Sequence, residues 1–294
     1  MYILEFDGGR IFKRTPKGEL SHFAGTGKSG YGGDGGPAIS ATFKGMHSLS
    51  VSNAGDVYVA DTHNNCVRRI DGKTQIITTI AGTTKKGFAG DGGSKLKAQF
   101  NGIYCVDLND DETKLYLADL GNKRIRMIDL KTDLVTTVAG TGKRGKPTEG
   151  GVAAKSPLVD PRAVAVDSKG NVYILERGGH ALRVVTPDGK IETVAGLSGK
   201  KGKVNGNASE SSLNGPKHLY AVPNRSGSDA TANNRIVIAD AENSLIREYD
   251  PKTGLLSTLP IKNTKRPHGV SIGRDGFLYV ADSYKHRVVR YKGK

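Results

Sequence analysis

Side chains that can hold a charged ligand recur at one place in this sequence, the first position of a short apolar segment. They differ in chemical type from one occurrence to the next, as the residues of a ligand site do. The five residues at this position are His47, Tyr104, Arg162, Lys217 and His268, and a sixth residue, His218, stands just beside Lys217. Arginine and lysine bind carboxylate and phosphate groups through charge and hydrogen bonds. We therefore predict that these six residues form a ligand-binding site.

A second series of residues is acidic and ends similar apolar segments. Its members are Glu5, Asp61, Asp119, Glu176, Asp240 and Asp282. An arginine follows five or seven residues later, at Arg10, Arg68, Arg124, Arg126, Arg183, Arg247 and Arg287. A catalytic site needs a few distinct groups, whereas these acids are equivalents of one another. We predict a structural ring, in which the acids pair with arginines or cap the polar turn that follows them.

Both series are regular because the chain is built from six copies of one unit. The clearest copy contains Gly55–Asp61, and the same pattern returns at Tyr2–Glu5, Lys114–Asp119, Asn171–Glu176, Arg235–Asp240 and Phe277–Asp282. The second unit reads as four strands joined by short turns, over Ser48–Val51, Val57–Ala60, Val67–Ile70 and Ile76–Ala81. Repeated four-stranded meanders predict an all-β fold, a six-bladed β-propeller of four-stranded antiparallel blades, as a single domain over residues 1–294.

The two terminal units are incomplete. The first has strands at Tyr2–Leu4, Ile11–Arg14 and Leu20–Ala24 but no inner strand, and the last has strands at Val270–Ile272, Leu278–Ala281 and Arg287–Tyr291 but no outer strand. We therefore expect incomplete terminal blades. Either the native chain extends further, or two short blades complete the ring.

Insertions of about 15 residues lengthen the connections from an outer strand to the next inner strand. They are rich in Gly, Lys and Ser and span Gly25–Lys44, Gly82–Asn101, Gly140–Asp160 and Gly196–Asn214. Another polar loop, Pro223–Asn234, is expected to be mobile. In a meander, the start of the first strand and the end of the second lie at the same edge. We therefore expect the ligand residues, the acids and the insertions on one face, at the mouth of the central channel.

Composition limits the partners that this protein can have. Lys and Arg number 44 against 29 Asp and Glu, and the net charge of +15 favours anionic partners. No run approaches the about 18 apolar residues that a membrane helix needs, so we expect no membrane insertion. Met1–Leu4 is already a predicted strand, so this sequence shows no signal peptide. Cys66 and Cys105 predict two reduced, partly buried thiols, with a bridge between them as the alternative.

The sequence pattern of the repeat resembles that of the NHL-repeat propellers, especially bacterial secreted ones. The resemblance rests on Ala24–Gly27, Gly33–Pro37, Asp56–Asp61 and Asn64–Arg68, with second copies of parts of this pattern at Ala81–Gly82, Gly90–Gly93 and Asn122–Arg126. It implies a propeller fold and an extracellular or periplasmic location. Functions within this family are diverse and include RNA binding, adhesion, kinase sensing and zinc-dependent amidating lyase activity.

The lyase resemblance implies a zinc ion held by three histidines on alternate blades. His47 and His268 match two of these places, but Arg162 stands at the third, which makes a poor zinc site by ligand count. Gly25–Ser29 resembles the end of a phosphate-binding loop but lacks its first glycine and its helix. The Gly-Asp-Gly-Gly segments around Asp34 and Asp91 lack the alternating acids of a calcium loop, so we assign their glycines to turns. We predict no metal and no cofactor.

The function that we predict is non-enzymatic binding of an anionic small molecule or an acidic polysaccharide, by a monomer that can also have a protein partner. One alternative is a metal-assisted lyase or hydrolase resembling the peptidyl-amidating lyases, with His47, Arg162, Lys217 and His268 acting on an anionic or carbonyl substrate. The other alternative is RNA binding. It is disfavoured because aromatic residues for base stacking are few on the predicted face, namely Tyr31, Phe88 and Tyr104.

Overall fold

The computed structural model describes residues 1–222, 234–273 and 275–292, and the chain forms two compact units, 1–137 and 138–294. The loop predicted to be mobile, Pro223–Asn234, lies outside the described residues except for Asn234. Among the described residues, no helix has the length and apolar character needed to cross a membrane.

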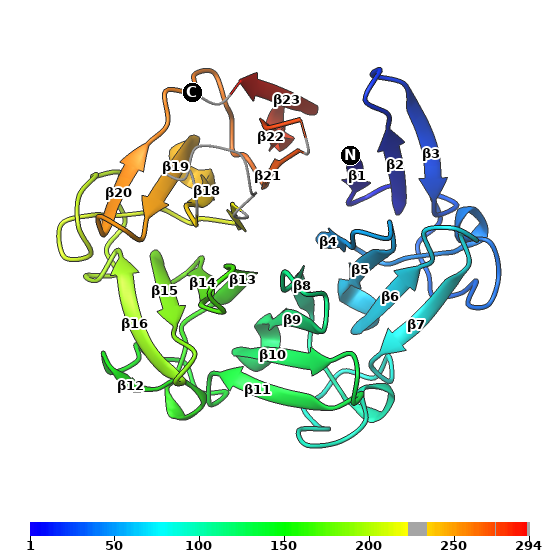
Figure 1. Cartoon of the computed structure of the whole chain (residues 1–294), viewed down its shortest axis with the longest axis horizontal. Coiled ribbons are helices and arrows are strands. Elements are labelled where there is room, and N and C mark those ends of the chain that lie inside the picture. Colours follow the sequence, from blue (N-terminus) through cyan, green and yellow to red (C-terminus); the bar gives the residue numbers. More distant parts are fainter. Residues whose placement is uncertain (223–233, 274, 293–294) are drawn as a thin grey trace. The chain divides into compact units, whose positions relative to one another are not determined.

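The first unit holds three antiparallel sheets, and consecutive strands are neighbours in each (Figure 1). The first sheet consists of β1 (Tyr2–Glu5), β2 (Arg10–Arg14) and β3 (Leu20–Ala24). The second consists of β4 (Ser48–Val51), β5 (Val57–Asp61), β6 (Cys66–Ile70) and β7 (Ile77–Ala81). The third consists of β8 (Ile103–Leu108), β9 (Lys114–Asp119), β10 (Arg124–Asp129) and β11 (Val135–Ala139), whose end runs into the second unit.

The second unit also holds three antiparallel sheets. The fourth sheet of the chain has the order β12-β16-β15-β14-β13, with bounds Gly151–Val152 (β12), Pro161–Val166 (β13), Val172–Glu176 (β14), Ala181–Val185 (β15) and Lys190–Ala195 (β16). The fifth consists of β17 (His218–Ala221), β18 (Ile236–Asp240), β19 (Leu245–Asp250) and β20 (Leu255–Thr258). The sixth consists of β21 (Gly269–Ile272), β22 (Phe277–Asp282) and β23 (Arg287–Lys292).

These six small meanders are the blades of a six-bladed β-propeller, which confirms the predicted fold class. Within the described residues, the first sheet lacks an inner strand and the sixth lacks an outer one, as predicted for the terminal blades. The prediction that residues 1–294 form a single domain stays a prediction.

The second strand of a blade is the most buried. Every residue of β5, β14 and β18 is buried, because sheet neighbours flank these strands and apolar side chains cover both of their faces. Valine and isoleucine suit such positions, since their branched side chains pack well on a pleated surface. Burying one such side chain contributes about 1.5–3 kcal/mol. These strands are therefore rigid supports for the acids at their ends.

A single 3-10 turn follows the acid at the end of the second strand. Four of these turns are η2 (Thr62–Asn64), η4 (Leu120–Asn122), η7 (Ala241–Asn243) and η8 (Ser283–Lys285). Each ends on a residue in the left-handed region, such as Asn65 with φ 53°. That residue reverses the chain, so that the third strand begins opposite the acid, as in the pair Asp61↔Cys66.

The insertions cover the outer edges of the blades that follow them. They contain the short helices η1 (Ala38–Ser40), η3 (Lys95–Lys97) and η5 (Ala153–Lys155). Their bridges to residues of, or next to, the outer strands are Pro37↔Ile76, Ser94↔Leu134, Gly151↔Ile191 and Gly206↔Leu256. Covering an outer strand protects backbone groups that could otherwise pair with another chain. The middle of each insertion thus lies along an outer strand. This corrects the expectation that the insertions gather at the mouth of the central channel.

Candidate functional site

The residues predicted to bind ligand occupy equivalent register positions. Each of His47, Tyr104, Arg162, Lys217 and His268 directly precedes the residue that pairs with the penultimate residue of the second strand. These pairs are Ser48↔Ala60, Cys105↔Ala118, Ala163↔Leu175, His218↔Ala239 and Gly269↔Ala281. The register shifts at Tyr104 and at Arg162, and such bulges re-aim a side chain.

In the first unit, His47 and Tyr104 form an aromatic cluster. Their ring centroids are 4.1 Å apart, and the ring of Phe6 lies 4.6 Å from that of His47. Nδ1 of His47 lies 3.1 Å from the Thr62 hydroxyl, which orients the imidazole. Gly45 has φ 60°, and a Cβ there would lie 2.4 Å from Nδ1 of His63, whose ring also contacts Phe6 and His47. Sequence reasoning did not single out Phe6 or His63.

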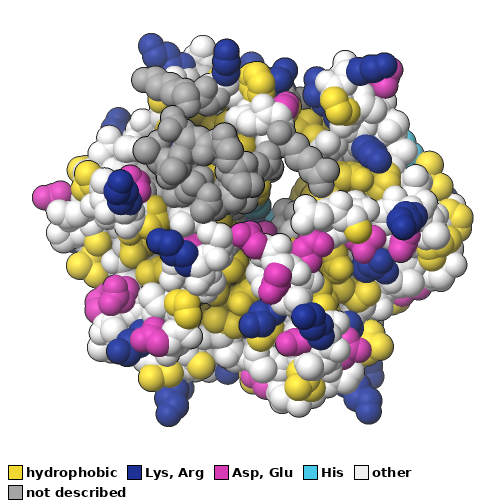
Figure 2. All heavy atoms as spheres, viewed as in Figure 1, with side chains coloured by type: hydrophobic (Ala, Val, Ile, Leu, Met, Phe, Trp, Pro, Cys, Tyr) yellow, Lys and Arg dark blue, Asp and Glu magenta, His cyan; other side chains and the backbone are white. Residues whose placement is uncertain are grey.

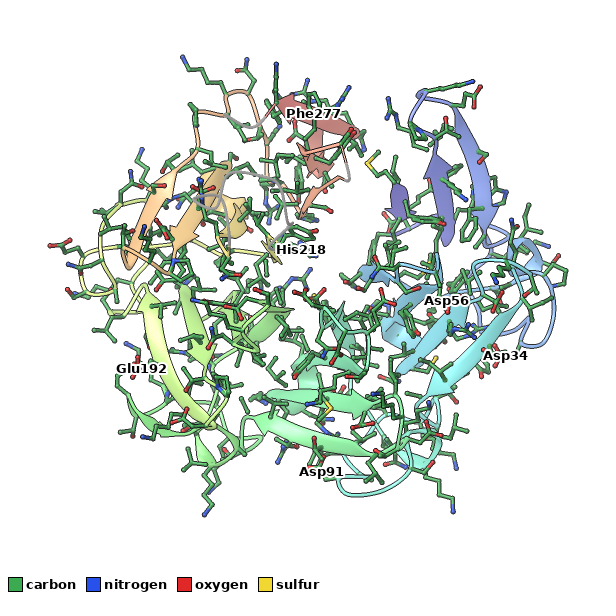
Figure 3. The ribbon with its side chains drawn as sticks, viewed as in Figure 1. Asp34, Asp56, Asp91, Glu192, His218 and Phe277 are labelled. Atoms are coloured by element: carbon green, nitrogen blue, oxygen red, sulfur yellow. The ribbon has the colours of Figure 1, made fainter. Side chains whose placement is uncertain are left out.

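In the second unit, Arg162, Lys217, His218 and His268 come together, because the inner strands β13 and β17 contact each other, as do β17 and β21. Nζ of Lys217 lies 2.7 Å from Nε2 of His268. Nδ1 of His218 accepts a hydrogen bond of 3.5 Å from the amide of Val270. Figure 3 shows His218 on β17, among the side chains of this unit. We call these four residues the basic cluster.

The carboxylate of Glu242 lies beside the basic cluster. Oε1 of Glu242 lies 3.8 Å from Nζ of Lys217 and 2.5 Å from Nη2 of Arg266. Glu242 follows the acid Asp240 by two residues, and Arg266 precedes His268 by two. Sequence reasoning missed both. The available signal was their closeness to repeat positions already identified.

Arg162 is buried, the other three residues of the cluster are partly buried, and the cluster carries a positive potential. The side chain of Lys217 is 10% exposed, and its pKa is lowered to about 8, first by burial and then by the charges of Arg266, Arg162 and Arg177, against the opposing effect of Glu242. Burial and the charges of Lys217, Arg162 and Arg266 lower the pKa of His268 to about 4. Both imidazoles are neutral at pH 7, because burial and the charge of Arg162 lower the pKa of His218 to about 4 as well.

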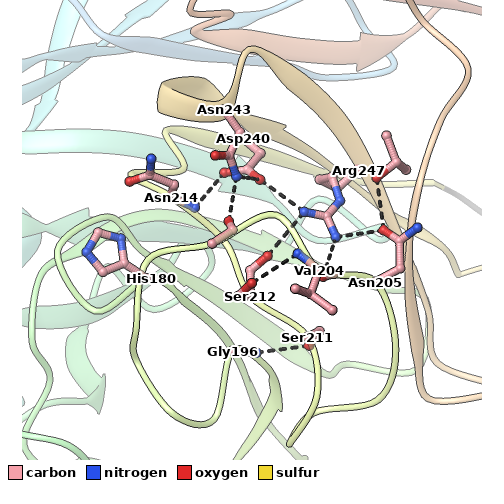
Figure 4. A network of polar contacts seen from close by, with 12 residues as sticks. His180, Gly196, Val204, Asn205, Ser211, Ser212, Asn214, Asp240, Asn243 and Arg247 are labelled. Atoms are coloured by element: carbon pink, nitrogen blue, oxygen red, sulfur yellow. Dashed lines mark hydrogen bonds and ion pairs between the residues drawn. The ribbon is translucent and has the colours of Figure 1, made fainter.

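The acids that end the second strands are held by buried partners. Figure 4 shows Asp240, which accepts hydrogen bonds from the Asn214 amide at 2.8 Å, from the Asn243 side chain at 2.8 Å and from Nη1 of Arg247 at 3.1 Å. Asp61 and Asp119 accept the equivalent hydrogen bonds from a backbone amide and an asparagine side chain, and the equivalent arginines form ion pairs with them at 3.5 and 3.7 Å. Burial raises the pKa of all three acids to about 6, so they are ionised at neutral pH.

The other acids differ in their degree of burial. Glu176 accepts hydrogen bonds from Arg183 at 2.8 Å and from the Val159 amide at 2.5 Å, and Asp282 pairs with Arg287 at 2.9 Å. Glu5 is 44% exposed and lies 3.4 Å from Arg10. These contacts are the kind that a structural role requires. We propose that role for the acidic series.

The aspartates of the two Gly-Asp-Gly-Gly segments have partners that the sequence did not indicate. Asp34 lies 2.7 Å from the buried guanidinium of Arg68, and Asp91 lies 2.9 Å from that of Arg126. Figure 3 shows Asp34 beside β7 and Asp91 beside β11. Turn formation by the glycines is therefore only part of the role of these segments, since each aspartate also ties its insertion to the following blade.

Within residues 1–222, 234–273 and 275–292, no group of three or more His, Cys, Asp or Glu side chains is placed to hold a metal ion. Cys66 and Cys105 are both buried free thiols. His47 and His268 belong to different units.

The fold defines a β-propeller, and the matches to known proteins support the NHL β-propeller family. The NHL repeat model matches residues 43–70 and 264–291. NHL repeat-containing protein 2 of Gallus gallus is 27% identical over 278 residues, which cover 82% of this chain and 37% of that protein. Protein SUPPRESSOR OF QUENCHING 1, chloroplastic, of Arabidopsis thaliana is 28% identical over 260 residues, 79% of this chain and 23% of that protein. The chain thus spans well under half the length of these relatives.

Solved structures share the fold at low sequence identity. A chain in the nidogen/laminin complex has a TM-score of 0.65 and 16% identity, covering 98% of this chain and 87% of that one. An auxiliary nutrient binding protein from Bacteroides ovatus has a TM-score of 0.64 and 13% identity, with 98% and 68% covered. Virginiamycin B lyase from Staphylococcus aureus has a TM-score of 0.55 and 14% identity, with 100% and 80% covered. At these identities the likeness concerns the fold alone.

Proposed function

We propose that this protein is a non-enzymatic binding protein and that the basic cluster of Arg162, Lys217, His218 and His268 holds a small anion. The observation that carries this proposal is the convergence of these basic residues at neighbouring inner strands, with Nζ of Lys217 2.7 Å from Nε2 of His268 and only one carboxylate, Glu242, described beside it, at 3.8 Å. The neighbouring cations outweigh that carboxylate, so the site has a positive potential that a bound anion relieves.

The side chains suit a carboxylate, sulfate or phosphate group. Arg162 offers a planar fork of donors that matches such groups, and the ammonium of Lys217 adds a point charge. On the face seen in Figure 2, Lys and Arg side chains are scattered among Asp and Glu side chains instead of forming one continuous patch. This distribution favours a small anion over a long acidic polymer.

The aromatic residues support the same choice over RNA. The ring of Tyr31 lies 5.0 Å from the guanidinium carbon of Arg68, and that of Phe88 lies 3.7 Å from the guanidinium carbon of Arg124. Tyr104 contacts His47. Tyr31 and Phe88 stay exposed but each contacts an arginine, and Tyr104 contacts a histidine, so few rings are present as platforms for single-stranded RNA.

Calorimetric titration tests the proposal. Wild-type protein is titrated with sulfate, propionate, uronic-acid oligosaccharides and short RNA, at low and at physiological salt. We expect sulfate or propionate to bind, and an Arg162→Ala, Lys217→Ala double variant to bind about 100-fold more weakly, since each hydrogen bond to a charged group contributes about 1.5–3 kcal/mol.

A matched control removes the same charge elsewhere. Lys200 and Lys252 are exposed, and a Lys200→Ala, Lys252→Ala double variant is expected to bind like the wild type. Equal affinity of wild type and site variant, or no binding of any small anion at low salt, would contradict the proposal. Tight binding of only the oligosaccharide or only the RNA would identify a polymer ligand instead.

We further propose that the protein belongs to the bacterial secreted type and acts outside the cytoplasm. The support is the resemblance of the repeat sequence to the bacterial secreted propellers. Fractionation of the full natural gene product, tagged and expressed in its source organism, tests this location. Recovery of the protein in the cytosol alone would contradict it.

A further inference from the structure

Lys217 and His268 form a hydrogen-bonded pair. Their side-chain nitrogens are 2.7 Å apart, although the residues are 51 positions apart in the chain. A hydrogen bond between an amine and an imidazole needs one donor and one acceptor, so the imidazole accepts from Nζ through Nε2. This hydrogen bond therefore holds the side chain of Lys217 in place.

The surroundings of Lys217 favour its neutral amine more than the surroundings of an exposed lysine do. The groups that act on it are the cations Arg162, Arg177 and Arg266, the carboxylate Glu242, and His268. With a pKa of about 8, about a tenth of the amine is neutral at pH 7, against well under a thousandth for an ordinary lysine. Burial and neighbouring cations are the conditions under which lysines become nucleophiles.

We propose that Lys217 forms a reversible imine with the carbonyl group of a small oxo acid, whose carboxylate is held by Arg162. The inference rests on the anion site proposed above and names its ligand class. A 2-oxo acid has both groups on adjacent carbons, which suits two residues of neighbouring inner strands, because β13 contains Arg162 and contacts β17, which Lys217 directly precedes.

The chemistry balances without any further reactant. The fraction of Lys217 that has released its proton to water adds to the carbonyl carbon, forming a C–N bond, and one proton of the nitrogen moves to the oxygen, which becomes a hydroxyl. This hydroxyl takes up a proton from water and leaves as water while the C=N bond forms. Amine and carbonyl thus become imine and water with no change in oxidation state. Hydrolysis reverses the reaction, so the imine is a form of binding.

Reductive trapping tests the proposal. Wild-type protein is incubated at pH 7 with pyruvate and sodium cyanoborohydride, which reduces an imine to a stable secondary amine, and the modified lysines are mapped by peptide mass spectrometry. We expect modification of Lys217 at least about tenfold faster than that of exposed lysines such as Lys252, because more of its amine is neutral. Propionate, which has the carboxylate but no carbonyl, is expected to protect Lys217.

Two variants and one further reagent isolate the roles of the two residues. Lys217→Arg keeps the positive charge, so it is expected to retain propionate binding and to lose the fast adduct. Acetone, which has the carbonyl but no carboxylate, is expected to react slowly with the wild type. Arg162→Ala is expected to abolish the preference for pyruvate over acetone.

The outcomes separate this inference from the proposed function. Propionate binding without selective modification of Lys217 would overturn the imine and leave the anion site intact. Neither binding nor selective modification would overturn both. Equal reaction with acetone and pyruvate would overturn the role of Arg162 and with it the oxo-acid assignment.

Discussion

Asp240 joins three parts of its blade, because its carboxylate accepts hydrogen bonds from the preceding insertion, from the following turn and from Arg247. Asp240→Ala leaves a buried guanidinium without this carboxylate and two donors without an acceptor. We expect a loss of about 3–5 kcal/mol in the free energy of unfolding, measured by urea denaturation.

The control for Asp240→Ala is Asp188→Ala. Asp188 pairs with Lys190 at 3.6 Å, and both side chains are more than half exposed. This change is therefore expected to lower the free energy of unfolding by less than about 1 kcal/mol. A similar small cost for Asp240→Ala would show that the buried acid contributes little to stability.

The affinity of the proposed site for an anion is expected to depend on pH through the ionisation of Lys217. Its ammonium is charged below its pKa of about 8 and neutral above it, whereas His218 and His268, with pKa values near 4, stay neutral throughout. Affinity for sulfate is therefore expected to fall by about tenfold between pH 7 and pH 9.5, in titrations at constant ionic strength. Lys217→Arg should remove this fall, because arginine stays charged. An unchanged slope in that variant would assign the titration to another group.

The insertion over residues 25–44 is the element whose order depends most clearly on one side chain. Asp34 ties it to the guanidinium of Arg68, and the amides of Gly35 and Ala38 donate to the carbonyls of Ile77 and Gln75. Asp34→Ala removes the ion pair, while Arg68 retains Asp61. We expect hydrogen exchange of these two amides to become about tenfold faster, which corresponds to about 1.4 kcal/mol.

The next insertion provides an internal control for Asp34→Ala. The amides of Gly92 and Lys95 donate to the carbonyls of Val135 and Asp133 in the same manner, and Asp91 still pairs with Arg126. Their exchange is expected to stay unchanged. Faster exchange in both insertions would mean that the substitution loosens the whole unit.

For the whole molecule we predict a monomer. The insertions pair with the outer edges of four blades, so few backbone groups remain there for another chain. Large exposed apolar side chains such as Leu20, Leu134 and Leu255 come from different sheets or their flanking turns. Light scattering after size exclusion is expected to give a mass near 31.2 kDa. A concentration-dependent mass of twice that value would contradict the prediction.

The repeat predicted much of the fold, because strand length, turn residues and alternating apolar side chains are local properties. The predicted strands Leu20–Ala24 and Ser48–Val51 coincide with β3 and β4. The strand register followed from the same pattern, which is why the residues that precede the inner strands, from His47 to His268, occupy equivalent positions. The buried state of the repeated arginines was not evident, since a charged side chain is buried only where partners from elsewhere meet it.

By itself the sequence determined the blades, their order and the positions at which each inner strand begins, because each blade closes through neighbours in the chain. Only the tertiary structure decided which of those positions meet. It brings Lys217 to His268 across 51 residues and Asp34 to Arg68 across 34. The physical reason is that these contacts depend on how inner strands of adjacent blades pack and on where an insertion crosses the next blade, and no local pattern of residues encodes either.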